Sequence, residues 1–228
     1  MEETKDYTGH RQRLKERFLR GGGADMADYE MLELLLTLAI PRKDTKPLAK
    51  ALIKEFGSLA GVLGADNMRL MEFSGLKENT IIVFSIIREV ALRMAWQNLS
   101  AADKPIIADW DAMLDYCRMK LAHKEFEELM IIYLDAKLRV IGEEIQQRGT
   151  TDNVAIHPAE VVKSAVFHSA KNLIMVHNHP SGDVTPSKPD VLITQQVKLA
   201  LESVSIKLQD HLIIGKTEYY SFREQGLI

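Results

Sequence analysis

The sequence has one cysteine, no long apolar run and almost no excess of charge of either sign. With Cys117 alone in 228 residues, an internal disulfide framework, a zinc site built from several thiolates and a zinc deaminase site of the Pro-Cys-x-x-Cys type are all excluded. The longest apolar stretch, 31–40, is interrupted by Glu33 and is about half a membrane span. The N-terminal residues lack the apolar segment of a secretory signal. We therefore expect a soluble, cytoplasmic protein that does not insert into membranes.

The charge balance argues against non-specific nucleic-acid binding. Lys and Arg number 29 against 32 Asp and Glu, for a net charge of −3. Residues 1–98 carry 15 basic and 14 acidic side chains, so this part has a net charge of only +1. A protein that holds DNA through its phosphates needs a strongly basic surface. The composition, 46% hydrophobic and 27% charged, is that of an ordinary globular protein.

Periodicity divides the chain into a helical part and a mixed part. Over residues 1–98, apolar residues recur at helical spacing, which predicts a small all-helical bundle. Residues 99–109 are polar and then contain Pro105, which predicts a linker. From 110 to 228, apolar runs of strand length alternate with amphipathic segments. The expected fold is therefore α/β (α+β), with a helical bundle followed by a mixed sheet and flanking helices.

The most informative segment, 176–190, reads VHNHPSGDVTPSKPD. His177 and His179 end a buried-type strand, and residues two apart on a strand point to the same face. Their imidazoles can therefore converge on one point. If Ser187 is the N-cap of the next helix, Pro189 and Asp190 are its second and third residues. Proline fits there because the N–H groups of the first helical turn have no partner within the helix. Two imidazoles and one carboxylate would leave the fourth position of a zinc ion open.

Each fragment alone also has an ordinary explanation. A His-x-His pair occurs on many strands without function, and Ser-x-x-Asp can be a simple capping box at a helix start. The two fragments joined by a strand, a turn and a helix are much more specific.

The segment from His177 to Asp190 resembles the JAMM signature of JAB/MPN-type zinc metalloproteases, and its fuller form is similar to the RadC family. The same family resemblance extends to short motifs on both sides, Gly149-Thr150, His157-Pro158-x-Glu160, Asp210-His211 and Ile213-Ile214-Gly215. It implies a JAB/MPN-like (cytidine-deaminase-like) domain over 110–228. It further implies zinc on His177, His179 and Asp190, a bound water, and Ser187 as a hydrogen-bond partner of that water or of an oxyanion.

The resemblance also requires a glutamate that accepts a proton from water. The family places it just before an apolar strand that ends in Leu-Asp, which favours Glu127. Glu128 and Glu144 are the main alternatives, and Glu125 and Glu143 are also candidates. His211 is a candidate partner of a ligand's outer nitrogen, although a structural histidine is the commoner case.

Residues 71–80 resemble a helix-hairpin-helix DNA-binding element. Its second glycine is replaced by Lys77, and Glu78 adds a negative charge, so a packing or protein-docking bundle is favoured over a DNA-binding one. The leading hypothesis is a zinc-dependent hydrolase of peptide or isopeptide bonds. The alternatives are a DNA-associated repair or maintenance factor and a non-catalytic scaffold.

Overall fold

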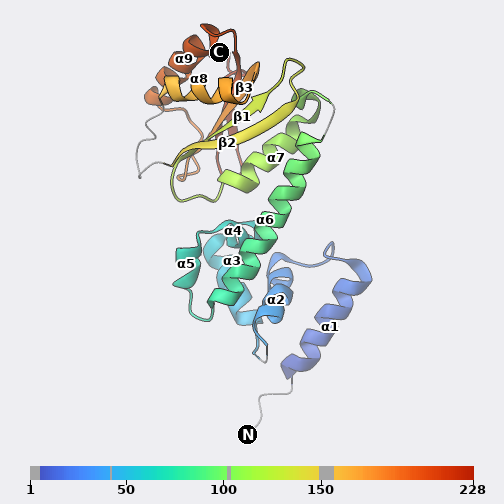
Figure 1. Cartoon of the computed structure of the whole chain (residues 1–228). Helices are drawn as coiled ribbons and strands as arrows, with labels where there is room; N and C mark the ends of the chain where they lie inside the picture. Colours follow the sequence, from blue (N-terminus) through green and yellow to red (C-terminus); the bar gives the residue numbers. More distant parts are fainter. Residues whose placement is uncertain (1–5, 42, 102–103, 149–156) are drawn as a thin grey trace. The chain divides into compact units, whose positions relative to one another are not determined.

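The computed structural model describes residues 6–41, 43–101, 104–148 and 157–228. The chain divides into two compact units, Met1–Val90 and Ala91–Ile228, coloured blue to green and green to red in Figure 1. Helix α6 (Glu78–Ser100) runs across the division. The expected linker, 99–109, overlaps the end of α6 and a short 3-10 helix, and residues 102 and 103 lie outside the described part.

Among the described residues of the first unit, every regular element is a helix, as predicted. Its helices before α6 are α1 (Asp6–Gly21), α2 (Asp28–Ala39), α3 (Lys46–Phe56), α4 (Leu59–Gly64) and α5 (Asn67–Met71). The core shared by α2 to α5 and the first part of α6 includes Leu32, Leu36, Leu52 and Phe84, each at most 1% exposed. In the hairpin between α5 and α6, Gly75 has a φ of +100°, a conformation that favours glycine. DNA binding by this hairpin stays a prediction.

The second unit combines a five-stranded sheet with helices, which confirms the expected mixed fold. The strand order is β2-β1-β3-β4-β5. β3 and β4 are parallel, and the other neighbouring pairs are antiparallel. The elements are η1 (Ile106–Asp109), α7 (Trp110–Leu121), β1 (Glu128–Leu134), β2 (Val140–Arg148), α8 (Pro158–Phe167), β3 (Asn172–Asn178), α9 (Lys188–Glu202), β4 (Lys207–Ile214) and β5 (Tyr219–Ser221).

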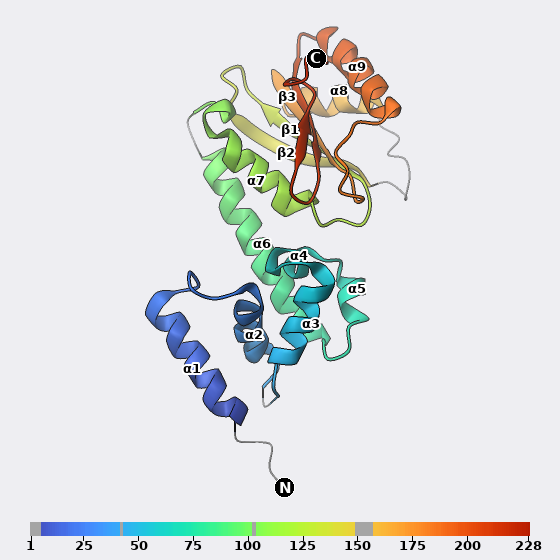
Figure 2. The same cartoon turned by 180° about the vertical axis from the view of Figure 1, so that it is seen from behind.

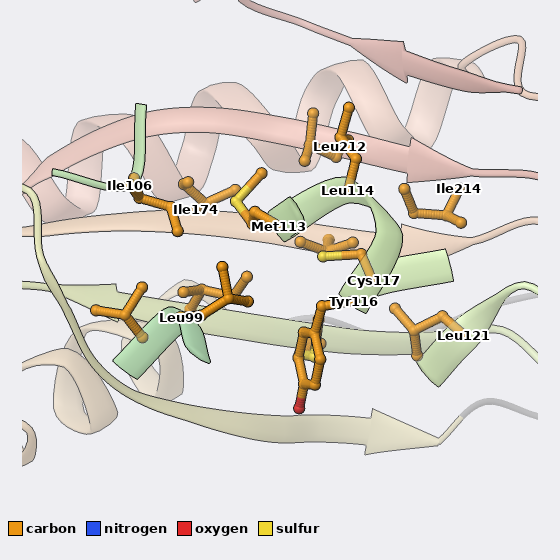
Figure 3. Close-up of a cluster of buried hydrophobic side chains, with 14 of the residues drawn as sticks. Leu99, Ile106, Met113, Leu114, Tyr116, Cys117, Leu121, Ile174, Leu212 and Ile214 are labelled. Atoms are coloured by element: carbon orange, nitrogen blue, oxygen red, sulfur yellow. The ribbon is translucent and has the colours of Figure 1, made fainter. Parts of the chain in front are cut away.

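Helices cover both faces of this sheet, with α7 on one side and α8 and α9 on the other (Figure 1). Figure 2 shows the same layers from behind. Every residue of β1 and β3 is buried, which explains why both sequences are continuous apolar runs rather than alternating ones. On the α7 side, Met113, Tyr116 and Cys117 belong to the same buried cluster as Ile174 and Leu212 (Figure 3).

Along the described residues, no helix combines the length and the apolar character needed to cross a membrane.

Candidate metal centre

The two histidines of the HNHP segment lie at the end of the central strand β3, as the sequence predicts. His177 is 4% exposed, and β3 ends at the next residue, Asn178. The chain stays beside β4 for one further residue, because the backbone N–H of His179 donates to the carbonyl of Ile214 at 3.1 Å. His177 and His179 therefore keep the strand alternation that puts both rings on the same face of the sheet.

The carboxylate of Asp190 is fixed by the first turn of α9. Ser187 is the N-cap of this helix and Asp190 its third residue, which confirms the predicted placement. The Asp190 N–H donates to Ser187 Oγ at 3.2 Å, and Ser187 N–H donates to Asp190 Oδ2 at 2.7 Å. The Ser187 hydroxyl also donates to Oδ2, at 2.6 Å. This capping box holds the carboxylate in one orientation.

Three side chains converge here on one point. The Nε2 atoms of His177 and His179 are 3.0 Å apart. Asp190 Oδ1 is 3.5 Å from Nε2 of His177, and Oδ2 is 3.6 Å from Nε2 of His179. Among the residues that the structure describes, this is the one group of His, Cys, Asp and Glu side chains placed to share a metal ion.

The tautomer of His179 follows from its other nitrogen. Its Nδ1 is 2.6 Å from the backbone carbonyl oxygen of Asp183. A carbonyl oxygen can only accept, so Nδ1 carries the hydrogen and Nε2 presents a lone pair. The loop 180–184 that supplies this carbonyl packs closely on the end of β4, where a Cβ on Gly215 would lie 2.9 Å from the Gly182 oxygen.

The tautomer of His177 is set by a chain of hydrogen bonds that returns to Asp190. The Thr194 hydroxyl donates to the Asp190 carbonyl one helical turn back, so its oxygen must accept from Nδ1–H of His211, 2.6 Å away. Nε2 of His211 is then an acceptor, and Nδ1–H of His177 donates to it at 2.8 Å. This leaves a lone pair on Nε2 of His177.

The two lone pairs face each other, which only a positive charge between them can stabilise. At 3.0 Å, the acceptor nitrogens of His177 and His179 need either a proton or a metal ion. The donor set of two neutral imidazoles and a carboxylate is the one that suits zinc. The residues present therefore fit a divalent transition metal, held by three protein atoms.

The electrostatics of the group agree with this arrangement. Burial lowers the pKa of His177 to about 4, so that ring stays neutral. The neighbouring carboxylate of Asp190 raises the pKa of His179. Burial alone would raise the pKa of Asp190, but its interactions with His179, His177 and Ser187 outweigh burial and lower it. His177 and Asp190 therefore hold their metal-binding protonation states near neutral pH, whereas a metal ion on His179 would have to displace the proton that Asp190 favours.

Glu127 faces this group from the neighbouring strand. Leu129 of β1 is the residue paired with His177 of β3, and Glu127 directly precedes β1, so it lies next to the strand end that carries His177 and His179. The charge of Glu127 contributes to the raised pKa of His179. The structure thus brings Glu127, favoured from the sequence, into electrostatic reach of the three converging side chains.

The alternative glutamates lie elsewhere. Glu128, one residue on, is buried and interacts with Lys124 at 3.7 Å. Glu143 accepts a hydrogen bond from the Tyr116 hydroxyl at 2.6 Å, on the α7 side of the sheet. Glu144 bonds the hydroxyls of Tyr133 and Ser164 beside α8, and Glu125 is exposed.

Of the remaining histidines, His211 is the one in contact with the group. It is fully buried and stacks on Phe222 at a centroid distance of 4.8 Å. His157 occupies the N-cap position of α8, but its side chain makes no capping hydrogen bond. Gly149 and Thr150, which also carry the family resemblance, lie outside the described residues.

Sequence analysis missed Thr194 and the role of Asn178. Thr194 follows Asp190 by four residues on a helix, so the spacing alone placed both on one helix face. Asn178 alternates with the two histidines along the strand, and its side chain reaches the backbone of Phe126 and Glu128 instead.

Comparison with known proteins places this geometry in a family. Residues 107–227 match the model of a RadC-like JAB domain. A UPF0758 protein from Ruegeria pomeroyi is 46% identical over 219 residues, which cover 96% of this chain and 97% of that protein. Another UPF0758 protein, from Rhodobacter capsulatus, is 45% identical and is matched over its whole length by 94% of this chain.

Proposed function

Because this chain belongs to the RadC-like JAB domain family, we propose that it is a zinc-dependent hydrolase of peptide or isopeptide bonds. The observation that carries the proposal is the convergence of Nε2 of His177, Nε2 of His179 and the Asp190 carboxylate within metal-ligand reach. Three protein ligands leave a tetrahedral ion one open position, which distinguishes catalytic from structural zinc sites.

The metal would be held by His177, His179 and Asp190. When bound there, zinc would supply Lewis-acid chemistry, polarising the substrate carbonyl and making water more acidic. The protein's contribution is to fix the ligands in their deprotonated forms. The carbonyl of Asp183 and the imidazole of His211 do this by holding the outer nitrogens of the two histidines.

Glu127 is proposed as the proton carrier. Its charge acts on His179, and its carboxylate would accept a proton from the attacking water. It would then pass the proton to the leaving amine. Ser187 is exposed at the start of α9, with its hydroxyl beside the Asp190 carboxylate. With a metal ion on Asp190, this hydroxyl would turn its single hydrogen from Asp190 to the oxygen that becomes negative during attack.

Metal content tests the first half of the proposal. We expect about one zinc per chain in the purified protein, and little in His177→Ala. His123→Ala is the matched control, because His123 is a half-buried histidine outside the group. Near-zero zinc in the wild-type protein, or equal zinc in wild type and His177→Ala, would contradict the metal site.

Comparing the proteomes of cells that carry variants tests the second half. Cells with Glu127→Gln should accumulate uncleaved proteins that are processed in wild-type cells, whereas Glu125→Gln, two residues away and exposed, should match wild type. The uncleaved proteins would identify the substrate. A zinc-loaded protein with identical proteomes in all three strains would instead support a non-catalytic scaffold.

A further inference from the structure

The side-chain amide of Asn178 bridges β3 to the segment that carries Glu127. Its Nδ2 donates to the backbone carbonyl of Phe126 at 3.0 Å, and its Oδ1 accepts from the backbone N–H of Glu128 at 2.9 Å. The two contacts hold the residues immediately before and after Glu127. Asn178 is only 1% exposed, so its side-chain amide is itself shielded from solvent.

These contacts lie where the sheet itself stops. The last backbone pair between β1 and β3 joins Leu129 to His177, and β1 begins at Glu128. Beyond this pair, the two side-chain contacts of Asn178 continue the connection between β3 and the segment before β1. The amide of Asn178 takes the place of the missing backbone pair, because it offers one donor and one acceptor as a peptide group does.

We propose that Asn178 is a positioning residue that holds Glu127 opposite His179. The inference rests on the proposed function, because Glu127 is the proposed proton carrier. Asn178 alternates with its neighbours on the strand, so its side chain leaves the face of the histidines. It therefore sets the place of the proton carrier without touching the metal ligands.

The same strand contains a matched control at its other end. Asn172 is 7% exposed, and its Nδ2 donates to the backbone carbonyl of Asp135, just after β1, at 2.8 Å. Its Oδ1 accepts from Gln209 Nε2 at 2.6 Å. Asn172→Ala and Asn178→Ala thus each remove two hydrogen bonds of a buried amide side chain on β3, but only the second lies beside Glu127.

The first measurement is hydrogen exchange of the Glu128 backbone amide by NMR in the full-length, metal-free protein. In Asn178→Ala we expect it to exchange about tenfold faster or more, because its acceptor is removed. In Asn172→Ala it should exchange as in wild type. Equal rates in the two variants would overturn the proposal, and this readout does not depend on metal or activity.

The second measurement uses Co²⁺ in place of zinc, with the pH midpoint of its visible absorption as the readout. Glu127→Gln should shift this midpoint, and Asn178→Ala should shift it in the same direction. The Co²⁺ affinity of Asn178→Ala should stay within about threefold of wild type, because no ligand is removed. Asn172→Ala should leave it unchanged. In a Glu127→Gln background, Asn178→Ala should add nothing, since its effect acts through Glu127.

The outcomes separate this inference from the proposed function. The hydrolase proposal is contradicted if the wild-type protein binds no Co²⁺ or if Glu127→Gln leaves the midpoint unchanged. In either case, hydrogen exchange of the Glu128 amide still decides whether Asn178 holds the segment. A shift by Asn178→Ala that persists in the Glu127→Gln background contradicts the positioning role alone.

Discussion

Thr194 on α9 accepts a hydrogen bond from His211 on β4, with 2.6 Å between Oγ1 and Nδ1. Because the threonine hydroxyl gives its own proton to the carbonyl of Asp190, the direction of this bond is fixed. One hydroxyl thus determines the tautomer of His211 and, through it, that of the proposed ligand His177.

Thr194→Val should weaken zinc binding about 10- to 100-fold, the usual effect of losing an outer partner of a metal ligand. The variant keeps the shape of the side chain but lets His211 carry its proton on Nε2. That N–H would donate to Nδ1 of His177, so the hydrogen of His177 would move to Nε2, the nitrogen that should bind the metal. Competition with a chelating dye measures the affinity. Thr194→Ser, which keeps the hydroxyl, should restore most of it, and a valine variant with wild-type affinity would refute the tautomer argument.

Gly215→Ala should displace the loop that orients His179. The added Cβ would lie 2.8 Å from Val184 Cγ1 and 2.9 Å from the Gly182 carbonyl oxygen, closer than packed atoms allow. We expect a loss of about 1–3 kcal/mol in stability together with weaker zinc binding, measured by denaturant unfolding and dye competition.

The control for this variant is Gly226→Ala, where an added Cβ meets nothing within 4 Å. Gly226 has a φ of +70°, so this change strains the backbone without touching the loop. Zinc affinity should then stay at the wild-type value. Equal affinities in the two glycine variants would show that the loop tolerates the change.

The stability contributed by Glu144 should depend on pH. The Ser164 hydroxyl bond is the main cause that lowers the pKa of Glu144 in the folded protein, with Tyr133 and His168 adding to it. A carboxyl with a lowered folded pKa stabilises above its unfolded pKa, about 4.3, and loses that contribution as pH falls through the folded value.

The difference in unfolding free energy between wild type and Glu144→Gln should therefore be full at pH 7 and shrink below about pH 4. Both tryptophans, Trp96 and Trp110, belong to the second unit, so their fluorescence in a urea titration reports this transition. A gap that is constant from pH 7 to pH 3 would contradict the assignment. Zinc content should match wild type, because Glu144 lies outside the metal group.

Zinc should stabilise the second unit, and a chelator should reverse the effect. Free metal at 100 times its dissociation constant adds about 2.7 kcal/mol to the free energy of unfolding. Thermal unfolding with and without zinc measures this difference. Asp190→Ala should lower the melting temperature even without zinc, because it removes half of the capping box. It should also abolish most of the increase in melting temperature that zinc causes. An increment equal to that of wild type would show that the metal binds elsewhere.

Local pattern alone determined much of this protein. The run before His177 and the two-residue spacing to His179 predicted a strand with both rings on one face. Ser187, Pro189 and Asp190 predicted the helix start, which the structure confirms. These features depend on residues a few positions apart, where backbone geometry sets the side-chain directions.

Only the tertiary structure decided which distant groups join them. His211 reaches His177 across 34 positions of sequence, and Asn178 reaches Phe126 across 52. Such contacts depend on strand order, on register and on which helix covers which face. A shift of one residue in register would turn Glu127 to the α7 side and leave Glu128 facing the histidines. The pairing of β1 with β3 therefore favours Glu127 over Glu128 as the proposed proton carrier, and no local spacing specifies that pairing.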